Sequence, residues 1–158
     1  SRKSESIYSS YYFSMSKYAQ GKFKPKNPAK YIGRQLPTYR SSWEQRFMMF
    51  CDTNPSVLSW ASEPVKIPYF NPVKNKQTIY VPDFLIEYLD KNKHNHKELI
   101  EIKPRNQTLY EKTRSQRNKV AWVINQAKWK AAESWCKQYG ILFRILGENE
   151  LFHNGRSK

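Results

Sequence analysis

Two short segments of the chain carry acidic and basic residues at a spacing that suits the hydrolysis of phosphodiesters. They read V-P-D-F-L-I-E-Y, which contains Asp83, and K-E-L-I-E-I-K-P, which contains Glu101 and Lys103. Each is a short apolar run typical of a β-strand, in which side chains alternate between two faces. Glu101 and Lys103 therefore share a face. If the two strands are neighbours, two carboxylates and one ammonium converge on a single point.

This group of side chains predicts a divalent-cation site. Mg²⁺ prefers hard oxygen ligands and usually takes one or two carboxylates together with water and phosphate oxygens. Asp83 and Glu101 would supply the carboxylates, and the backbone carbonyl of Ile102 lies within reach of the same ion. A cation held in this way lowers the pKa of a bound water and neutralises charge on a phosphate. Lys103 would then orient or activate the attacking water, and Mn²⁺ could replace Mg²⁺.

The same residue types also occur on the solvent-facing side of an ordinary surface hairpin. E-x-K alone is a very weak signal, whereas Pro-Asp before an apolar strand is rarer. The combined pattern, D-x17-E-x-K across two strand-like runs, is moderately specific. Both interpretations, a catalytic group and a solvated strand face, remain open on this pattern alone.

The rest of the chain predicts the elements that must hold these segments in place. Apolar spacing, turn residues and helix-ending residues divide it into alternating helices and strands. The expected elements are a helix over 42–52, strands over 57–62, 64–69 and 77–89, a polar turn over 90–97, a strand over 98–103, a helix over 113–139 ended by Gly140, a strand over 141–146 and a short helical turn over 147–152. This order predicts an α/β domain with a mixed sheet and helices packed on it.

The charge of the chain points to a polyanionic partner. Its net charge is +15, from 28 Lys and Arg against 13 Asp and Glu, and aromatic residues make up 15%. Such a balance favours nucleic acid, and no apolar stretch is long enough to favour a membrane. Cys51 and Cys136 lack the spacing of a zinc site or a disulfide framework. We expect both to be reduced, buried thiols, which fits a cytosolic compartment.

The basic residues are concentrated near the N-terminus. Residues 1–40 contain nine Lys or Arg and one acid, together with eight aromatic residues and several Gly and Pro. We expect residues 1–37 to form a basic aromatic arm and residues 38–158 to form the domain. The arm would become ordered only against a partner or a neighbouring subunit, and a disordered basic tail is the alternative.

The combination of motifs and elements resembles the PD-(D/E)XK nuclease superfamily. The matching parts are Glu44 on the first helix, Pro82-Asp83, Glu101-Ile102-Lys103, and the helix and strand over 113–146. The runs S-W-E-Q-R-F, V-P-D-F, E-I-K-P, K-W-K-A-A-E-S-W-C and G-I-L-F-R-I-L resemble the endonuclease subunit of heteromeric transposases and, more closely, the head-completion nuclease of large tailed bacteriophages. The resemblance covers about residues 38–150. It implies a restriction-endonuclease-like fold, with a mixed central sheet flanked by helices.

The resemblance also implies a role for individual residues. Asp83 and Glu101 would ligate the metal with the Ile102 carbonyl, and Lys103 would serve the attacking water. Glu44 would be a helix-borne acid that completes the catalytic set. However, Ser41-x-x-Glu44 also forms the sequence of a capping box, in which the glutamate serves the helix end instead.

Five basic residues are candidates for contacts with DNA phosphates. Four of them follow the E-x-K strand, and the fifth lies further along the predicted long helix, where a solvated helix face is the alternative interpretation. They are Arg105, Arg114, Arg117, Lys119 and Lys128.

The function implied by the resemblance is a Mg²⁺-dependent deoxyribonuclease that processes packaged DNA during phage head completion, before the neck and tail attach. Its partners would be DNA, portal and neck proteins and further copies of itself on the portal. It would work in the host cytoplasm during assembly and at the virion head or connector. The alternative is a non-catalytic, DNA-binding head or portal protein built on a nuclease fold.

Overall fold

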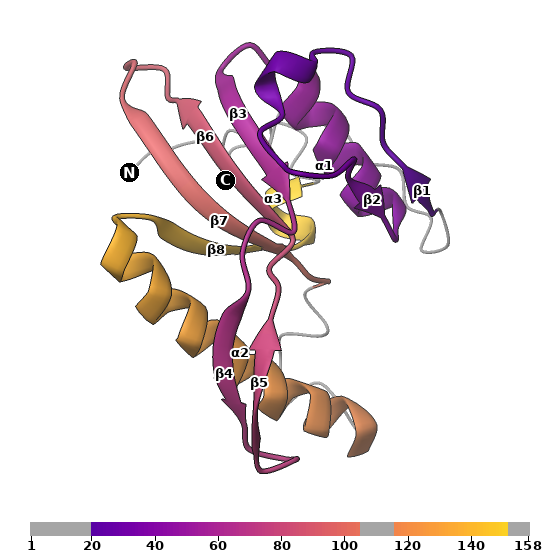
Figure 1. Cartoon of the computed structure of the whole chain (residues 1–158), viewed down its shortest axis with the longest axis vertical. Coiled ribbons are helices and arrows are strands. Elements are labelled where there is room, and N and C mark those ends of the chain that lie inside the picture. The colour runs from indigo at the N-terminus through magenta and orange to yellow at the C-terminus, as the bar shows by residue number, and fades with distance from the viewer. Residues whose placement is uncertain (1–19, 105–115, 152–158) are drawn as a thin grey trace.

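The computed structural model describes residues 20–104 and 116–151. Its elements follow the predicted order closely (Figure 1). They are β1 (Gly21–Lys22), the 3-10 turn η2 (Pro28–Lys30), β2 (Thr38–Tyr39), α1 (Ser42–Thr53), β3 (Val57–Ser62), β4 (Ile67–Asn71), β5 (Lys76–Tyr80), β6 (Phe84–Leu89), β7 (Asn95–Ile102), α2 (Gln116–Tyr139), β8 (Leu142–Leu146) and α3 (Glu148–Leu151).

The centre of the fold is a four-stranded mixed sheet. Its strand order is β3-β6-β7-β8; the first three strands are antiparallel, and β8 runs parallel to β7. Helix α1 packs on one face of this sheet, and helix α2 packs on the other. The predicted fold class, a mixed central sheet flanked by helices, is therefore confirmed.

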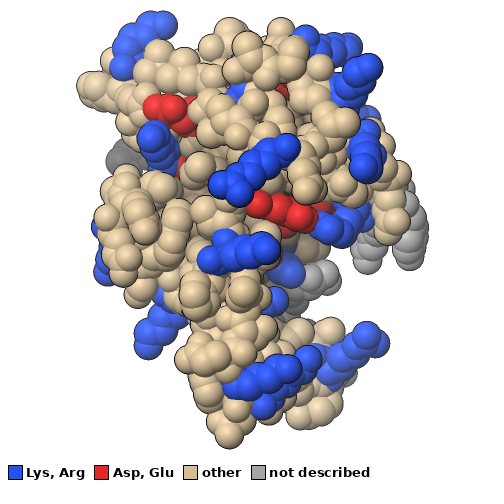
Figure 2. Space-filling model, viewed as in Figure 1, with Lys and Arg blue, Asp and Glu red and all other residues tan. Residues whose placement is uncertain are grey.

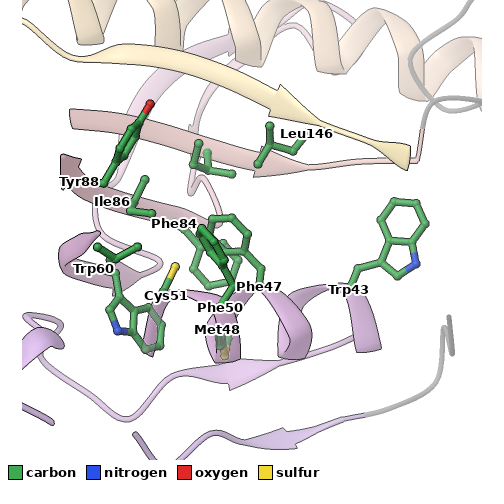
Figure 3. Close-up of a cluster of buried hydrophobic side chains, with 12 residues drawn as sticks. Trp43, Phe47, Met48, Phe50, Cys51, Trp60, Phe84, Ile86, Tyr88 and Leu146 are labelled. Atoms are coloured by element: carbon green, nitrogen blue, oxygen red, sulfur yellow. The ribbon is translucent and has the colours of Figure 1, made fainter. Parts of the chain in front are cut away.

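Helix α1 forms most of one hydrophobic core. Ser41 caps its first turn by accepting a hydrogen bond from the backbone N–H of Glu44. Phe47, Phe50 and Cys51 point towards the sheet, whereas Met48 lies on the opposite side of the helix (Figure 3). Phe47 stacks against Phe84 of β6, with 4.8 Å between ring centroids. Ile100 of β7 packs in the same cluster. The even-numbered positions of β6 and β7 thus face α1, as strand alternation predicts.

Helix α2 covers the opposite face of the sheet. Trp129, Ala132 and Cys136 are buried against Leu99 of β7. The helix ends at Tyr139, and Gly140 then adopts φ +66°, a left-handed conformation that favours glycine after a helix. The expected end of the long helix is confirmed, as is the burial of both cysteines as free thiols. None of the helices within the described ranges is long and apolar enough to cross a bilayer.

The expected single strand over 77–89 is divided in the structure into β5 and β6. Within the described residues, β5 pairs with β4 alone, and the two form a separate hairpin, which lies against α2 beyond the edge of the central sheet (Figure 1). The expected strand is interrupted at residues 81–83. Pro82 has no backbone N–H to donate to a ladder, so the chain leaves one sheet there and enters the other as β6.

The described part of the predicted N-terminal arm, residues 20–37, packs on the domain's own core. Phe23 and Tyr31 contact the indole of Trp60 edge-on, and the backbone N–H groups of Lys26 and Asn27 donate to the carboxylate of Asp52 at 2.9 Å. These residues are therefore ordered without a partner. The domain boundary at residue 37 remains a prediction.

Candidate active site

The pairing of β6 with β7 brings the two predicted metal-binding acids together. Phe84 lies opposite Ile100 in the antiparallel ladder, so the next position outward sets Asp83 across from Glu101. The carboxylate of Asp83 is held by the end of this ladder, because Oδ2 accepts a hydrogen bond from the backbone N–H of Ile102 at 2.7 Å. Strand alternation sets both acids on the face of Leu85 and Leu99, which is the face that α2 covers.

Glu101 is fixed by a donor and a cation. Its exposed fraction is 9%, and Oε1 accepts a hydrogen bond from the hydroxyl of Tyr80 at 2.7 Å. Oε2 lies 3.9 Å from Nζ of Lys103, whose backbone N–H donates to the carbonyl of Leu146 on β8. The predicted neighbours Asp83, Glu101 and Lys103 therefore meet at the point where β6 begins and β7 ends.

The surroundings make the negative charges of the two acids unfavourable. Burial raises the pKa of Asp83 well above its usual value, and the neighbouring carboxylates of Glu101 and Glu44 raise it further. Burial also raises the pKa of Glu101, although the hydrogen bond from Tyr80 and the charge of Lys103 oppose this rise. A pair of acids with raised pKa values at the ends of the two inner strands of the sheet is a candidate functional site.

Glu44 serves the end of its helix and also lies near the acids. Its backbone N–H donates to the hydroxyl of Ser41, which is one half of a capping box. Its Oε1 accepts from the backbone N–H of Arg40 at 3.2 Å, one residue before the N-cap, and its Oε2 lies 3.4 Å from the hydroxyl of Ser41. Its charge nevertheless reaches the site, because it raises the pKa values of both Asp83 and Glu101. A catalytic role for Glu44 remains a prediction.

The structure shows the positions of three of the five candidate DNA-binding residues. Lys128 lies beside the acids, with Nζ 5.7 Å from the centroid of the Tyr80 ring, and burial lowers its pKa while the charge of Glu101 opposes this change. Arg117 and Lys119 lie in the first turn of α2. Arg105 and Arg114 lie outside the described residues.

Tyr80 is a residue of the site that sequence reasoning did not select. It is 4% exposed, and its hydroxyl is the donor closest to Glu101. Burial and the adjacent carboxylate raise its pKa, so it remains a neutral donor. Its position three residues before Asp83 is visible in the sequence. The fold of the hairpin, which turns this side chain towards β7, is not.

Within residues 20–104 and 116–151, no group of three or more His, Cys, Asp or Glu side chains is arranged to hold a metal ion. The candidate site therefore provides a pair of carboxylates, Asp83 and Glu101, with backbone atoms around them. Metal binding by this pair and by the Ile102 carbonyl remains a prediction.

Comparison with known proteins finds relatives that match the part of the chain in which the candidate site lies. Residues 54–148, which include Asp83, Glu101 and Lys103, match the family described as TnsA-like endonuclease N terminal. The chain is also 37% identical over 142 residues to the "Head completion nuclease" of Enterobacteria phage T4, and the match covers 83% of this chain and 92% of that protein. These findings confirm the resemblance to transposase endonuclease subunits and phage head-completion nucleases. The chain belongs to the TnsA-like endonuclease N-terminal family.

Proposed function

We propose that this protein is a metal-dependent DNA nuclease that hydrolyses phosphodiester bonds at the site formed by Asp83, Glu101 and Lys103. The observation that carries the proposal is the cross-strand pair of acids, Asp83 partly buried and Glu101 buried, with the ammonium of Lys103 3.9 Å from Glu101. Membership of an endonuclease family supports it. The net charge of +15 suits a DNA substrate.

The donor set of this site fits a hard divalent cation such as Mg²⁺. Asp83 and Glu101 provide two carboxylates, which is the number that Mg²⁺ commonly takes when water and phosphate oxygens complete its shell. Both carboxylates have raised pKa values, and a nearby cation would relieve the cost of their ionisation. Asp83, Glu101 and the Ile102 carbonyl would hold the ion, which when bound would activate a water and neutralise charge on the phosphate.

The chain's own side chains have separate tasks in this proposal. The ammonium of Lys103 orients the attacking water and stabilises the negative charge that develops on the phosphate oxygens. The hydroxyl of Tyr80 fixes the carboxylate of Glu101 by donating to Oε1. Lys128 adds a second positive charge on the α2 side of the site, within reach of a substrate phosphate.

The setting that we propose is phage head completion, in which the protein processes packaged DNA before the neck and tail attach. The name of the 37% identical relative supports this setting. Portal and neck proteins, and further copies of this chain on the portal, would be its partners. It would work in the host cytoplasm during assembly and at the virion head or connector.

The test is cleavage of supercoiled and linear DNA by the purified protein with Mg²⁺, with Mn²⁺ and with EDTA. We expect cleavage with either cation and none with EDTA. Glu101→Gln should abolish cleavage. Glu98→Gln is the matched control, because Glu98 is also a buried glutamate of β7 bonded to a tyrosine, at 2.6 Å from Tyr88, but lies on the other face of the sheet. It should retain cleavage.

Two outcomes would contradict the proposal. Equal cleavage by wild type and Glu101→Gln would show that the activity belongs to another site or to a contaminant. DNA binding without cleavage under any divalent cation would favour the non-catalytic head or portal protein instead.

A further inference from the structure

The β4–β5 hairpin projects from the domain beside the candidate site. It pairs with no strand of the central sheet, and together with the first half of α2 it forms a lobe that extends below the sheet in Figure 1. We define the hairpin lobe as residues 64–82 together with residues 116–132 of α2. Tyr80 and Lys128 are the residues of this lobe that the proposed chemistry uses, so the shape and surface of the rest need another explanation.

The two faces of the hairpin differ in burial. On the inner face, Ile67, Tyr69 and Tyr80 are buried against α2, in the hydrophobic core on the α2 side of the sheet. On the outer face, Phe70 and Ile79 are exposed by 46% and 54%. The inner face anchors the hairpin, so the outer face is held in a fixed position with apolar side chains towards solvent.

The tip of the hairpin is held by a side-chain turn. Asn71 is 4% exposed, and its Oδ1 accepts hydrogen bonds from the backbone N–H groups of Val73 and Lys74 at 2.9 and 3.0 Å. Asparagine commonly stabilises turns in this way. Lys74 and Lys76 are both exposed at this tip. Their backbone positions are therefore fixed before any partner arrives, which reduces the entropy lost on binding.

The charge of the lobe has a single sign. Residues 64–82 contain Lys66, Lys74 and Lys76 and no acid, and residues 116–132 contain four further Lys or Arg and no acid. In Figure 2 the lower part of the molecule shows Lys and Arg atoms and no Asp or Glu atoms. A surface of this kind is complementary to a polyanion, whereas a second copy of the chain would bring seven like charges against seven.

The lobe leads directly into the site. Strand β5 ends at Tyr80, which donates to Glu101, and only Val81 and Pro82 separate it from Asp83. Lys128 of α2 lies over the ring of Tyr80. A polyanion bound along the lobe would therefore pass the two acids, and a two-stranded ribbon has the width that the major groove of duplex DNA admits.

We propose that the hairpin lobe binds duplex DNA next to the site of cleavage, with Lys74 and Lys76 on the phosphate backbone and the outer face of β4–β5 against the groove. The proposal rests on the proposed function for its account of what is cleaved. It makes the hairpin the element that selects double-stranded over single-stranded DNA.

The test is binding of a fluorescently labelled 30-base-pair duplex, and of one of its strands alone, measured by anisotropy in EDTA over a range of salt concentrations. K74E/K76E should weaken duplex binding at least tenfold and reduce the salt slope by about 2, since each phosphate contact contributes about 0.9 to it. Its effect on the single strand should be several-fold smaller. The matched control is K91E/K93E, the same charge change on the exposed β6–β7 turn, which should weaken duplex binding less than threefold.

Several results would overturn the proposal. Equal weakening by the two charge reversals would show that only net charge matters, and equal weakening on duplex and single strand would remove the duplex selectivity. The double variant F70S/I79S should also weaken duplex binding. If wild type instead sediments as a dimer, F70S/I79S sediments as a monomer and this variant binds duplex normally, the outer face is the interface with a second copy of the chain. Cleavage with Mg²⁺ is measured in parallel. If wild type cleaves DNA and K74E/K76E binds duplex as wild type does, the hairpin proposal alone is refuted. If wild type does not cleave DNA, the proposed nuclease function is refuted, and the binding data alone decide whether the hairpin binds duplex.

Discussion

Asp83 is placed where its ionised form is least favourable for an unliganded protein. It is partly buried, it lies near two other carboxylates, and it accepts a hydrogen bond from the backbone N–H of Ile102. A group with such surroundings lowers the stability of the fold whenever it is charged. Stability is thus reduced at the position where the proposed chemistry requires a carboxylate.

The first prediction is that Asp83→Asn stabilises the metal-free protein while abolishing cleavage. Asparagine keeps an oxygen that can accept from Ile102 but carries no charge. The pKa of Asp83 is raised in the fold, so its protonated side chain contributes stability that is fully present below the usual pKa of 3.8. This stability is lost as pH rises through the folded pKa. The melting temperature of the variant should therefore exceed that of wild type by an amount that grows as pH rises above 3.8 towards the folded pKa, to several degrees, since about 1 kcal/mol shifts Tm by about 2–4 °C at this size.

The control for this prediction is a divalent cation. Added Mg²⁺ or Mn²⁺ should raise the melting temperature of wild type and have little effect on the variant. A variant that melts below wild type at every pH would show that the carboxylate is well solvated or well paired, and that the site is not strained by charge.

The second prediction concerns Tyr80 as a positioning residue. Tyr80→Phe removes the donor to Oε1 of Glu101, which leaves that carboxylate less fixed and raises its pKa. We expect cleavage to fall about tenfold and the Mg²⁺ concentration for half-maximal activity to rise. Tyr88→Phe removes the equivalent bond to Glu98 and should lose about 1 kcal/mol of stability with little change in cleavage. Equal losses of cleavage in the two variants would reduce Tyr80 to a structural residue.

The chemistry-bearing residues could be predicted from sequence because strand alternation is local. The two-residue period places Glu101 opposite to Ile100 and Ile102, and Ile100 and Ile102 do pack in the core that faces α1. Tyr80 could not be predicted, because its role depends on a contact between the hairpin and the central sheet. Alternation says which face a side chain takes, not which strand lies across from it.

The helices and most strands could likewise be predicted to within a few residues. Helix α1 starts after Ser41, where an N-cap residue precedes an apolar period, and α2 ends before Gly140. The arrangement of the strand over 77–89 could not be predicted, because both halves are apolar and only Pro82 divides them. Pairing of β4 with β5 rather than with β6 is a tertiary choice, set by burial of Ile67 and Tyr69 against α2.

The third prediction concerns the segment that packs below α1. Asp52 is 1% exposed at the end of this helix, and its carboxylate accepts from the backbone N–H groups of Lys26 and Asn27. Asp52→Ala leaves both donors without their partner, so we expect a loss of about 2–3 kcal/mol, measured by urea unfolding. Asp90→Ala is the control, because Asp90 also holds two backbone N–H groups, those of Asn92 and His94, together with the ring of His96, but in a turn where water can replace it. An equal loss in both variants would indicate that residues 20–37 contribute little to the core.

The distribution of charge over the molecule separates two tasks. The acids of the candidate site lie at the junction of β6 and β7, enclosed on one side by Lys103 and Lys128. All the charged residues of the hairpin lobe beside them are basic. The net charge of the chain predicted a polyanionic partner. The position of the basic lobe could not be predicted from composition, because it depends on how the hairpin packs on α2.

The most direct test of the account is cleavage of supercoiled DNA in Mg²⁺ by Lys103→Ala, compared with Lys97→Ala, an exposed lysine of β7, the strand that ends just before Lys103. The ammonium of Lys103 is the group that we place on the attacking water, and loss of such a group costs at least about a hundredfold in rate. We expect Lys103→Ala to lose that much while its melting and its binding to duplex DNA in EDTA stay close to wild type, and Lys97→Ala to cleave within about threefold of wild type. A folded, DNA-binding Lys103→Ala protein that cleaves at the wild-type rate would contradict the account.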